Sequence, residues 1–202
     1  MNAIKMAATI AFVGFMTQPA MAANDWKIDP AHTNADFSIK HMTVANVRGG
    51  FGKVTGSAKY DGKDFKDASV EATIDATSID THNTQRDEHL KSADFFDVAK
   101  YPTITFKSKS FKKTSAGFDM VGDLTMHGVT KPVTLHAEKF SAPVKMGTDM
   151  HIGTSATAKI NRKDFGVSFN KVLDNGGAML GEDVNITIEI DLTKKAETAS
   201  AK

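Results

Sequence analysis

Apolar side chains recur at every second position in several separate stretches of this chain. The longest such stretch is Asp183–Thr193, and Ser69–Thr77 and Phe118–Met126 show the same alternation. Successive side chains of a β-strand point to opposite faces, so this period predicts strands with one dry face and one wet face. The alternation also favours antiparallel pairing, because buried parallel strands read as continuous apolar runs.

Turn signals separate these alternating stretches. Tyr60–Asp64 is centred on Gly62, and His127–Pro132 joins two alternating stretches in the manner of a hairpin. Glycines between Gly49 and Gly56 indicate bends or bulges, which a curled sheet requires. Weaker alternation elsewhere brings the count to about eight strands, which predicts an all-β fold with a closed or nearly closed antiparallel barrel. A two-sheet sandwich has the same sequence pattern and remains the alternative.

One stretch, Thr81–Ala99, lacks the period of two. Residues Gln85–Lys91 are rich in helix formers, and Leu90, Phe95 and Phe96 supply a small apolar face. We therefore predict one short helix near residues 84–92, laid over an end of the sheet and closed off before Pro102.

The first 22 residues have the three-part pattern of a secretory signal peptide. Lys5 precedes the uncharged, mostly apolar run Met6–Met16, and Ala20-Met21-Ala22 supplies small residues at the expected cleavage site. The run is too short to span a membrane, which takes about 20 apolar residues, and no later segment is long and apolar enough. We expect a single domain over residues 23–193 and a disordered tail over 194–202.

Composition removes several classes of function. The predicted leader contains one of the 25 Lys and Arg residues and none of the 24 Asp and Glu residues, so the mature chain has no formal net charge. A neutral chain has no general electrostatic attraction to nucleic acid or to an anionic membrane. The chain has no cysteine, which excludes disulfides, thiolate catalysis and cysteine zinc sites.

The seven histidines do not form a recognisable metal or catalytic motif. H-x-x-x-H and H-E-x-x-H spacings are missing, as is G-x-S-x-G, so the sequence predicts no metal site and no catalytic residue. We expect Arg86, Asp87 and His89 to fasten the helix to the barrel by charge-assisted hydrogen bonds, and contact with the polar end of a ligand is the less favoured alternative. Arg162 and Asp164 are expected to play a similar structural part at another corner.

Eight motifs, in order, resemble those of the YceI-like, polyisoprenoid-binding family. They are Asp29-Pro30-Ala31-His32-Thr33, Phe37–Met42, Gly50-Phe51 with Gly56, Arg86–Leu90 followed by Ser92–Asp97, Tyr101–Phe106, Gly122–Val133, Arg162–Gly166 and Gly181–Val184. Thr33 stands where Ser is more usual and keeps the hydroxyl. The resemblance covers nearly all of the mature chain. It implies a lipocalin-like barrel, a periplasmic location, and an isoprenoid or quinone-like chain held inside. The motifs, Asp29 and His32 included, are expected to encode the scaffold more than ligand recognition.

A prenyl chain cannot form hydrogen bonds, so only its removal from water drives binding. A site for it should therefore be long, dry and lined along its whole length. The expected lining is Phe37, Ile39, Ile74, Leu90, Phe95, Ile104, Phe106, Met120, Met126, Ile152, Ile160 and Ile186. The same residues would pack the core of an ordinary β protein, so a filled interior stays open as the other interpretation.

Three hypotheses of function follow. The first is a periplasmic protein, monomeric or homodimeric, that carries or stores a long-chain isoprenoid lipid or quinone and needs no cofactor. A transient membrane redox partner is compatible with it. The second is an enzyme that acts on such a lipid through His89 and Asp87. The third is a packed barrel that holds no ligand and binds a protein partner.

Overall fold

The computed structural model describes residues 24–174 and 176–196, so the predicted leader lies outside the described residues. The elements in chain order are β1 (Asp25–Ile28), β2 (Asn34–His41), β3 (Ala45–Phe51), β4 (Val54–Lys59), β5 (Ser69–Asp75), η1 (Ala76–Ser78), β6 (Ile79–Asp80), α1 (Thr84–Lys91), β7 (Thr103–Lys113), β8 (Gly117–Met126), β9 (Val129–Glu138), β10 (Val144–Met146), β11 (Asp149–Asn161), η2 (Arg162–Phe165) and β12 (Leu180–Lys195). Within these residues, no helix has the length and apolarity that a membrane crossing needs.

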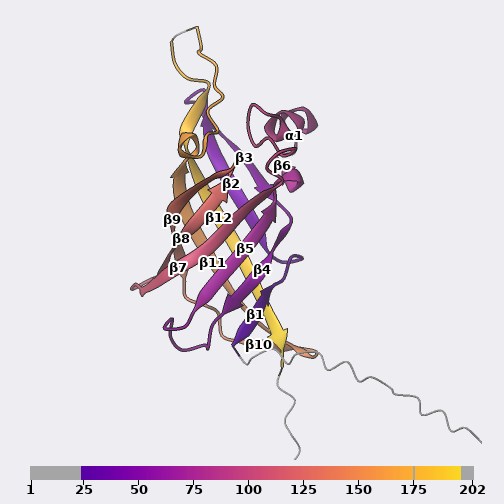
Figure 1. Ribbon diagram of the computed structural model, residues 1–202, viewed down its shortest axis with the longest axis vertical. Coiled ribbons are helices and arrows are strands. Elements are labelled where there is room, and N and C mark those ends of the chain that lie inside the picture. The colour runs from indigo at the N-terminus through magenta and orange to yellow at the C-terminus, as the bar shows by residue number, and fades with distance from the viewer. Residues whose placement is uncertain (1–23, 175, 197–202) are drawn as a thin grey trace, which may run out of the picture.

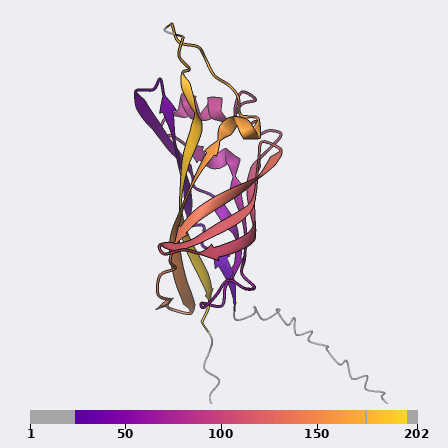
Figure 2. The ribbon, with the colours of Figure 1, turned by 90° about the vertical axis from the view of Figure 1, so that its left-hand side faces the viewer.

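The strands form the closed antiparallel barrel that the alternation predicts (Figures 1 and 2). The twelve strands occupy eight positions around the ring, because β1 and β2, β3 and β4, β5 and β6, and β9 and β10 each share one position. The ring closes at β12, which pairs with β11 along one edge and with β1 and β2 along the other. This closure excludes the two-sheet sandwich.

The last strand runs two residues beyond the expected end of the domain at residue 193. Lys194 and Lys195 extend β12 because they pair with Met150 and Asp149 of β11. The domain therefore extends past residue 193, and residues 197–202 of the predicted tail lie outside the described part of the chain.

The predicted short helix is confirmed as α1. The side chain of Asn83 caps its first turn by accepting the N–H of Arg86 at 3.0 Å. The helix lies at one end of the barrel, near β6, and β10 lies at the opposite end (Figure 1). We call these the upper end and the lower end.

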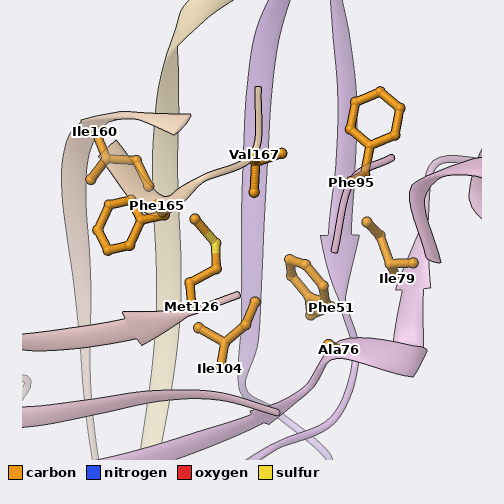
Figure 3. Close-up of a cluster of buried hydrophobic side chains, with 9 residues drawn as sticks. All are labelled: Phe51, Ala76, Ile79, Phe95, Ile104, Met126, Ile160, Phe165 and Val167. Atoms are coloured by element: carbon orange, nitrogen blue, oxygen red, sulfur yellow. The ribbon is translucent and has the colours of Figure 1, made fainter. Parts of the chain in front are cut away.

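Buried side chains gather in clusters at different heights of the barrel. The upper cluster includes Phe51, Ile104, Met126 and Phe165, and Figure 3 shows these residues reaching toward one another from three strands and from η2. A lower cluster contains Trp26, Ile28, Val54, Ile152 and Leu192. Strand alternation thus turns the apolar faces inward. Whether the interior is filled or hollow depends on how much space these inward side chains leave between them.

Candidate functional site

The interior of the barrel is hollow. It holds a cavity of about 440 Å³, which lies within the range of about 300–1,000 Å³ that is usual for small-molecule sites. Apolar side chains from strands all around the ring form most of its wall. The polar residues on its wall are Thr33, Asp36, His41, Arg86, His89, Thr105, Thr154 and Arg162. The site is therefore suited to a ligand that is mostly hydrocarbon.

Eleven of the twelve residues expected to line a ligand site do line this cavity. They are Phe37, Ile39, Ile74, Leu90, Phe95, Ile104, Phe106, Met120, Met126, Ile160 and Ile186. Ile152 is the exception, because it is buried among the side chains of the lower cluster and lies outside the lining, although Leu192, its partner on β12, does line the cavity. The expectation for Ile152 was wrong because strand alternation identifies the inward face but not which inward side chains are covered by their neighbours.

Aromatic rings close the lower end of the cavity. Phe65 lies 4.6 Å from Phe118, and Phe140 lies 4.7 Å from Tyr60 and 5.3 Å from Phe118, measured between ring centroids. Burial raises the pKa of the Tyr60 hydroxyl. Phe111 also stacks on Phe65 at 5.3 Å. We call this stack of rings at the lower end the aromatic floor of the cavity.

The segment around α1 covers the upper end. Leu90, Phe95 and Phe96 line the cavity from this segment, and Phe169 joins them from the chain that follows η2. The ring centroids of Phe95 and Phe169 lie 5.0 Å apart. The lid of the cavity is therefore built from two segments that are distant in sequence.

Arg86 and Asp87 fasten α1 to Thr81, just beyond β6. The buried carboxylate of Asp87 accepts the Thr81 N–H at 2.9 Å and also the Thr81 hydroxyl. Arg86 donates from Nη2 to the Thr81 carbonyl and from Nε to the Thr81 hydroxyl oxygen, both at 2.7 Å. These bonds agree with the structural part expected for the two residues, although Arg86 also lines the cavity.

His89 lies at the mouth of the cavity. It lines the cavity, yet 46% of its side chain is exposed, so the cavity reaches the surface beside it. Its Nε2 lies 2.8 Å from Asp94 Oδ2, and its ring meets Phe95 and Phe169 edge-on at 5.0 Å. His89 is therefore paired with Asp94, whereas the hypothesis of an enzyme combined it with Asp87.

Arg162 is almost completely buried, with 4% exposure, and it also lines the cavity. Its Nε donates to the Gly181 carbonyl at 2.9 Å, and its Nη1 donates to the Val167 carbonyl at 2.7 Å. Burial lowers the pKa of this guanidinium, and the negative charge of Glu182 partly offsets that effect. Asp164, the other residue expected to act at this corner, is exposed on η2 and lies on the wall of a separate outer hollow.

Asp29 and His32 lie on the barrel where the chain passes from β1 to β2. Asp29 Oδ2 is 2.8 Å from His32 Nδ1, and nearby Asp191 Oδ1 is 3.2 Å from His151 Nδ1. Among the described residues, one group has potential ligand atoms close enough together for a metal ion. It consists of Asp29, His151 and Asp191, whose ligand atoms all lie within 4.8 Å of one another. These atoms already form two ion pairs, in keeping with the scaffold part expected for Asp29 and His32.

Several lining residues were missed from the sequence. Phe140 and Phe169 lie in irregular segments, where no alternation marks the inward face. Ile188, Ile190 and Leu192 share the face of Ile186 on β12, so the alternation could have identified them. Arg162 was expected only as a structural residue, because sequence offers no sign of which corner closes over a cavity.

Comparison with known proteins places these observations in one family. The family model of the YceI-like domain matches residues 26–192 of this chain. Protein YceI of Escherichia coli is 39% identical over 183 residues, which cover 90% of this chain and 93% of that protein. The crystal structure of the Campylobacter jejuni YCEI protein is 32% identical, with a TM-score of 0.64 over 78% of this chain and 91% of that one. A polyisoprenoid binding domain from Saccharophagus degradans shares the fold, with a TM-score of 0.59 and 15% identity over 85% of this chain and 98% of that one.

Proposed function

The chain belongs to the family of YceI-like domains, and we propose that it binds a polyisoprenoid or quinone-like lipid inside its barrel, as a periplasmic carrier or store. The observation that carries this proposal is the hollow, apolar cavity of about 440 Å³. The Saccharophagus degradans domain of the same fold is described as polyisoprenoid binding, which supports this class of ligand.

Free-energy magnitudes favour a long ligand over a short one. Burial of one carbon contributes about 0.8 kcal/mol, so a five-carbon prenyl unit contributes at most about 4 kcal/mol. Association costs about 4–15 kcal/mol in lost freedom of motion. Several prenyl units are therefore needed, and the wall that runs from the aromatic floor to the lid at α1 offers contacts for them along the barrel.

The proposal assigns binding to this cavity and no reaction. Asp87 Oδ1 accepts two hydrogen bonds, both from Thr81, and these bonds fix the carboxylate in a structural position. His89 is paired with Asp94 at the mouth. The geometry therefore does not bring together the two residues on which the hypothesis of an enzyme depends.

The periplasmic part of the proposal depends on the predicted leader, residues 1–22. Export should release a mature chain that begins near Ala23. N-terminal sequencing of protein recovered from the periplasmic fraction tests this, and an uncleaved chain found only in the cytoplasm would contradict it.

Native mass spectrometry of freshly purified protein tests the ligand directly. We expect a complex heavier than the chain alone, whose added mass is extracted by organic solvent and shows the five-carbon repeat of a prenyl chain. Purified protein that carries no such lipid and takes up no added prenyl alcohol would contradict the proposal.

The substitution Ile74→Asp should abolish lipid binding, because a carboxylate in a dry wall is costly to bury. Thr73→Asp is the matched control, since Thr73 is the neighbouring residue of β5 and points to the opposite face. Binding of a fluorescent prenyl probe to both folded variants measures the effect. Normal binding by a folded Ile74→Asp variant would show that the ligand lies elsewhere.

A further inference from the structure

Arg162 keeps one hydrogen-bond donor without an acceptor. Two of its three nitrogens donate to the carbonyls of Gly181 and Val167. The third, Nη2, is buried and has no hydrogen-bond partner among the described residues. Buried donors are nearly always satisfied in folded proteins, so this unsatisfied one, on a side chain that lines the cavity, points to an acceptor that a bound ligand would supply.

The charge of Arg162 also lacks a counter-ion. None of the ion pairs among the described residues includes Arg162, and Glu182, whose charge acts on it, forms its own ion pair with Lys163. Burying a guanidinium without a paired carboxylate is unfavourable, because the low-dielectric interior disfavours an isolated charge. An anionic ligand group at this position would supply the missing charge as well as the missing acceptor.

The position of Arg162 suits the head of an amphiphile. Arg162 follows β11 and so lies at the upper end, as do Arg86 and His89, which also line the cavity. The lower end is closed by Phe65, Phe118 and other aromatic rings. A lipid with its tail toward this floor would bring its head group to the level of the three basic residues.

We propose that Arg162 anchors an anionic head group of the bound prenyl lipid, such as a phosphate or carboxylate, through a charge-assisted hydrogen bond from Nη2. This inference rests on the proposed function, since it specifies which class of prenyl lipid the cavity prefers. A neutral quinone carbonyl could accept the hydrogen bond but would leave the buried charge uncompensated. The anionic head satisfies both requirements.

Three probes with the same tail of four prenyl units separate the head from the tail: the monophosphate, the alcohol and a benzoquinone. Their affinities for the untagged protein are measured by displacement of a fluorescent prenyl probe. We expect the monophosphate to bind about tenfold more tightly than the alcohol or the quinone, as one hydrogen bond to a charged group contributes. Equal affinities for the three probes would overturn the proposal. If the quinone binds as tightly as the monophosphate and more tightly than the alcohol, the head group that Arg162 prefers is a neutral hydrogen-bond acceptor, which also overturns it.

Arg162→Gln should remove the preference for phosphate and leave the affinity for the alcohol, because the tail contacts remain. Lys159→Gln is the matched control, since Lys159 is an exposed cation near the end of β11 that pairs with Asp183 and leaves the pair of Lys163 and Glu182 intact. This control should keep the tenfold preference. If Arg162→Gln keeps it as well, or if both variants lose it, Arg162 is not the anchor.

Arg162 also holds two carbonyls, so Arg162→Gln must first be shown to fold by circular dichroism. If it does not fold, Arg162→Lys replaces it. Lysine keeps the charge and should retain the preference for phosphate over alcohol, and its loss would count against the charge as the source. Failure of all three probes to bind the natural protein would instead contradict the proposed function itself.

Discussion

Four polar side chains are buried in the described chain, and their partners distinguish scaffold from site. The Thr33 hydroxyl donates to the Asp191 carbonyl and accepts from the Asp191 N–H. Thr81 donates two hydrogen bonds to Asp87. Arg162 alone among these four retains a buried atom without a partner. A buried donor without an acceptor costs roughly 1–3 kcal/mol of stability. Of the four residues, Arg162 is therefore the one at which a ligand acceptor would contribute the most binding free energy.

Asp87→Asn should lower the free energy of unfolding by about 1–3 kcal/mol, because the two hydrogen bonds that Asp87 Oδ1 accepts from Thr81 lose the negative charge that strengthens them. Asp94→Asn is the control, since Asp94 is 53% exposed. Urea unfolding followed by circular dichroism measures both. Equal losses in the two variants would show that Asp87 does not hold α1 in place.

The pair of Asp29 and His32 should make stability depend on pH. The hydrogen bond between them lowers the pKa of Asp29 from its ordinary 3.8 and raises the pKa of His32 from its ordinary 6.5. The contribution of Asp29 is present above 3.8 and is lost as the pH falls through its lowered pKa. The contribution of His32 is present below 6.5 and is lost as the pH rises through its raised pKa.

His32→Gln should therefore lower the thermal midpoint most between the ordinary pKa values of 3.8 and 6.5, with the difference fading on either side. Thermal unfolding of the natural protein and the variant across this range provides the measurement. The exposed pair of His136 and Asp119 offers a comparison through His136→Gln. A difference for His32→Gln that does not vary with pH would contradict the assignment.

At the scale of elements, the backbone pairing between the long strands β9 and β11 is short. These strands pair at only two positions, Ala137 with Ala156 and His136 with Thr157, whereas β8 and β9 pair along their whole lengths. Beyond these positions lies an outer hollow whose lining includes Val133, Ile160 and Ile186, which also line the cavity. We call the contact between β9 and β11 the seam of the barrel. In its upper half, side-chain packing holds the two strands together more than backbone hydrogen bonds do.

Amide exchange should reveal this seam. Along Val129–Thr134, amides that point to β8 should be protected and those that point away should exchange quickly, because the pairing with β11 does not reach them. Strand β8 pairs on both edges and should be protected more evenly. Residue-resolved exchange by nuclear magnetic resonance measures this, and even protection along β9 would contradict the open seam.

At the scale of the whole molecule, the two ends of the barrel differ in kind. The lower end is a floor of stacked rings, and the upper end is covered by α1 and the segment with Phe169, with partly exposed His89 at its edge. Binding inside such a barrel replaces an empty volume with contacts to strands all around the ring, so the ligand should stabilise the fold as a unit.

Added prenyl lipid should therefore raise the thermal midpoint of delipidated protein. At a free ligand concentration 100 times the Kd, the gain is about 2.7 kcal/mol, which corresponds to roughly 5–10 °C for a domain of this size. Differential scanning calorimetry measures the shift. The Ile74→Asp variant should show none, and an equal shift in that variant would indicate binding at the outer surface.

The local pattern of the chain determined the strands, the short helix and most of the inward face. Alternation is a property of neighbouring residues, and it therefore predicted the barrel and nine of the ten lining positions proposed on strands, Phe37 and Ile186 among them. The motifs that resemble the YceI-like family identified the family correctly, since the match to the YceI-like domain spans residues 26–192.

Only the tertiary structure decided that the interior is hollow. Whether inward side chains meet or leave a cavity depends on the radius of the ring and on which side chains face one another across it, as Ile152 shows by packing with Trp26 in the lower cluster. The closing of both ends by Phe140 and Phe169, and the burial of Arg162 with a free donor, likewise depend on contacts between segments far apart in the chain. A pattern of neighbours carries no information about such contacts.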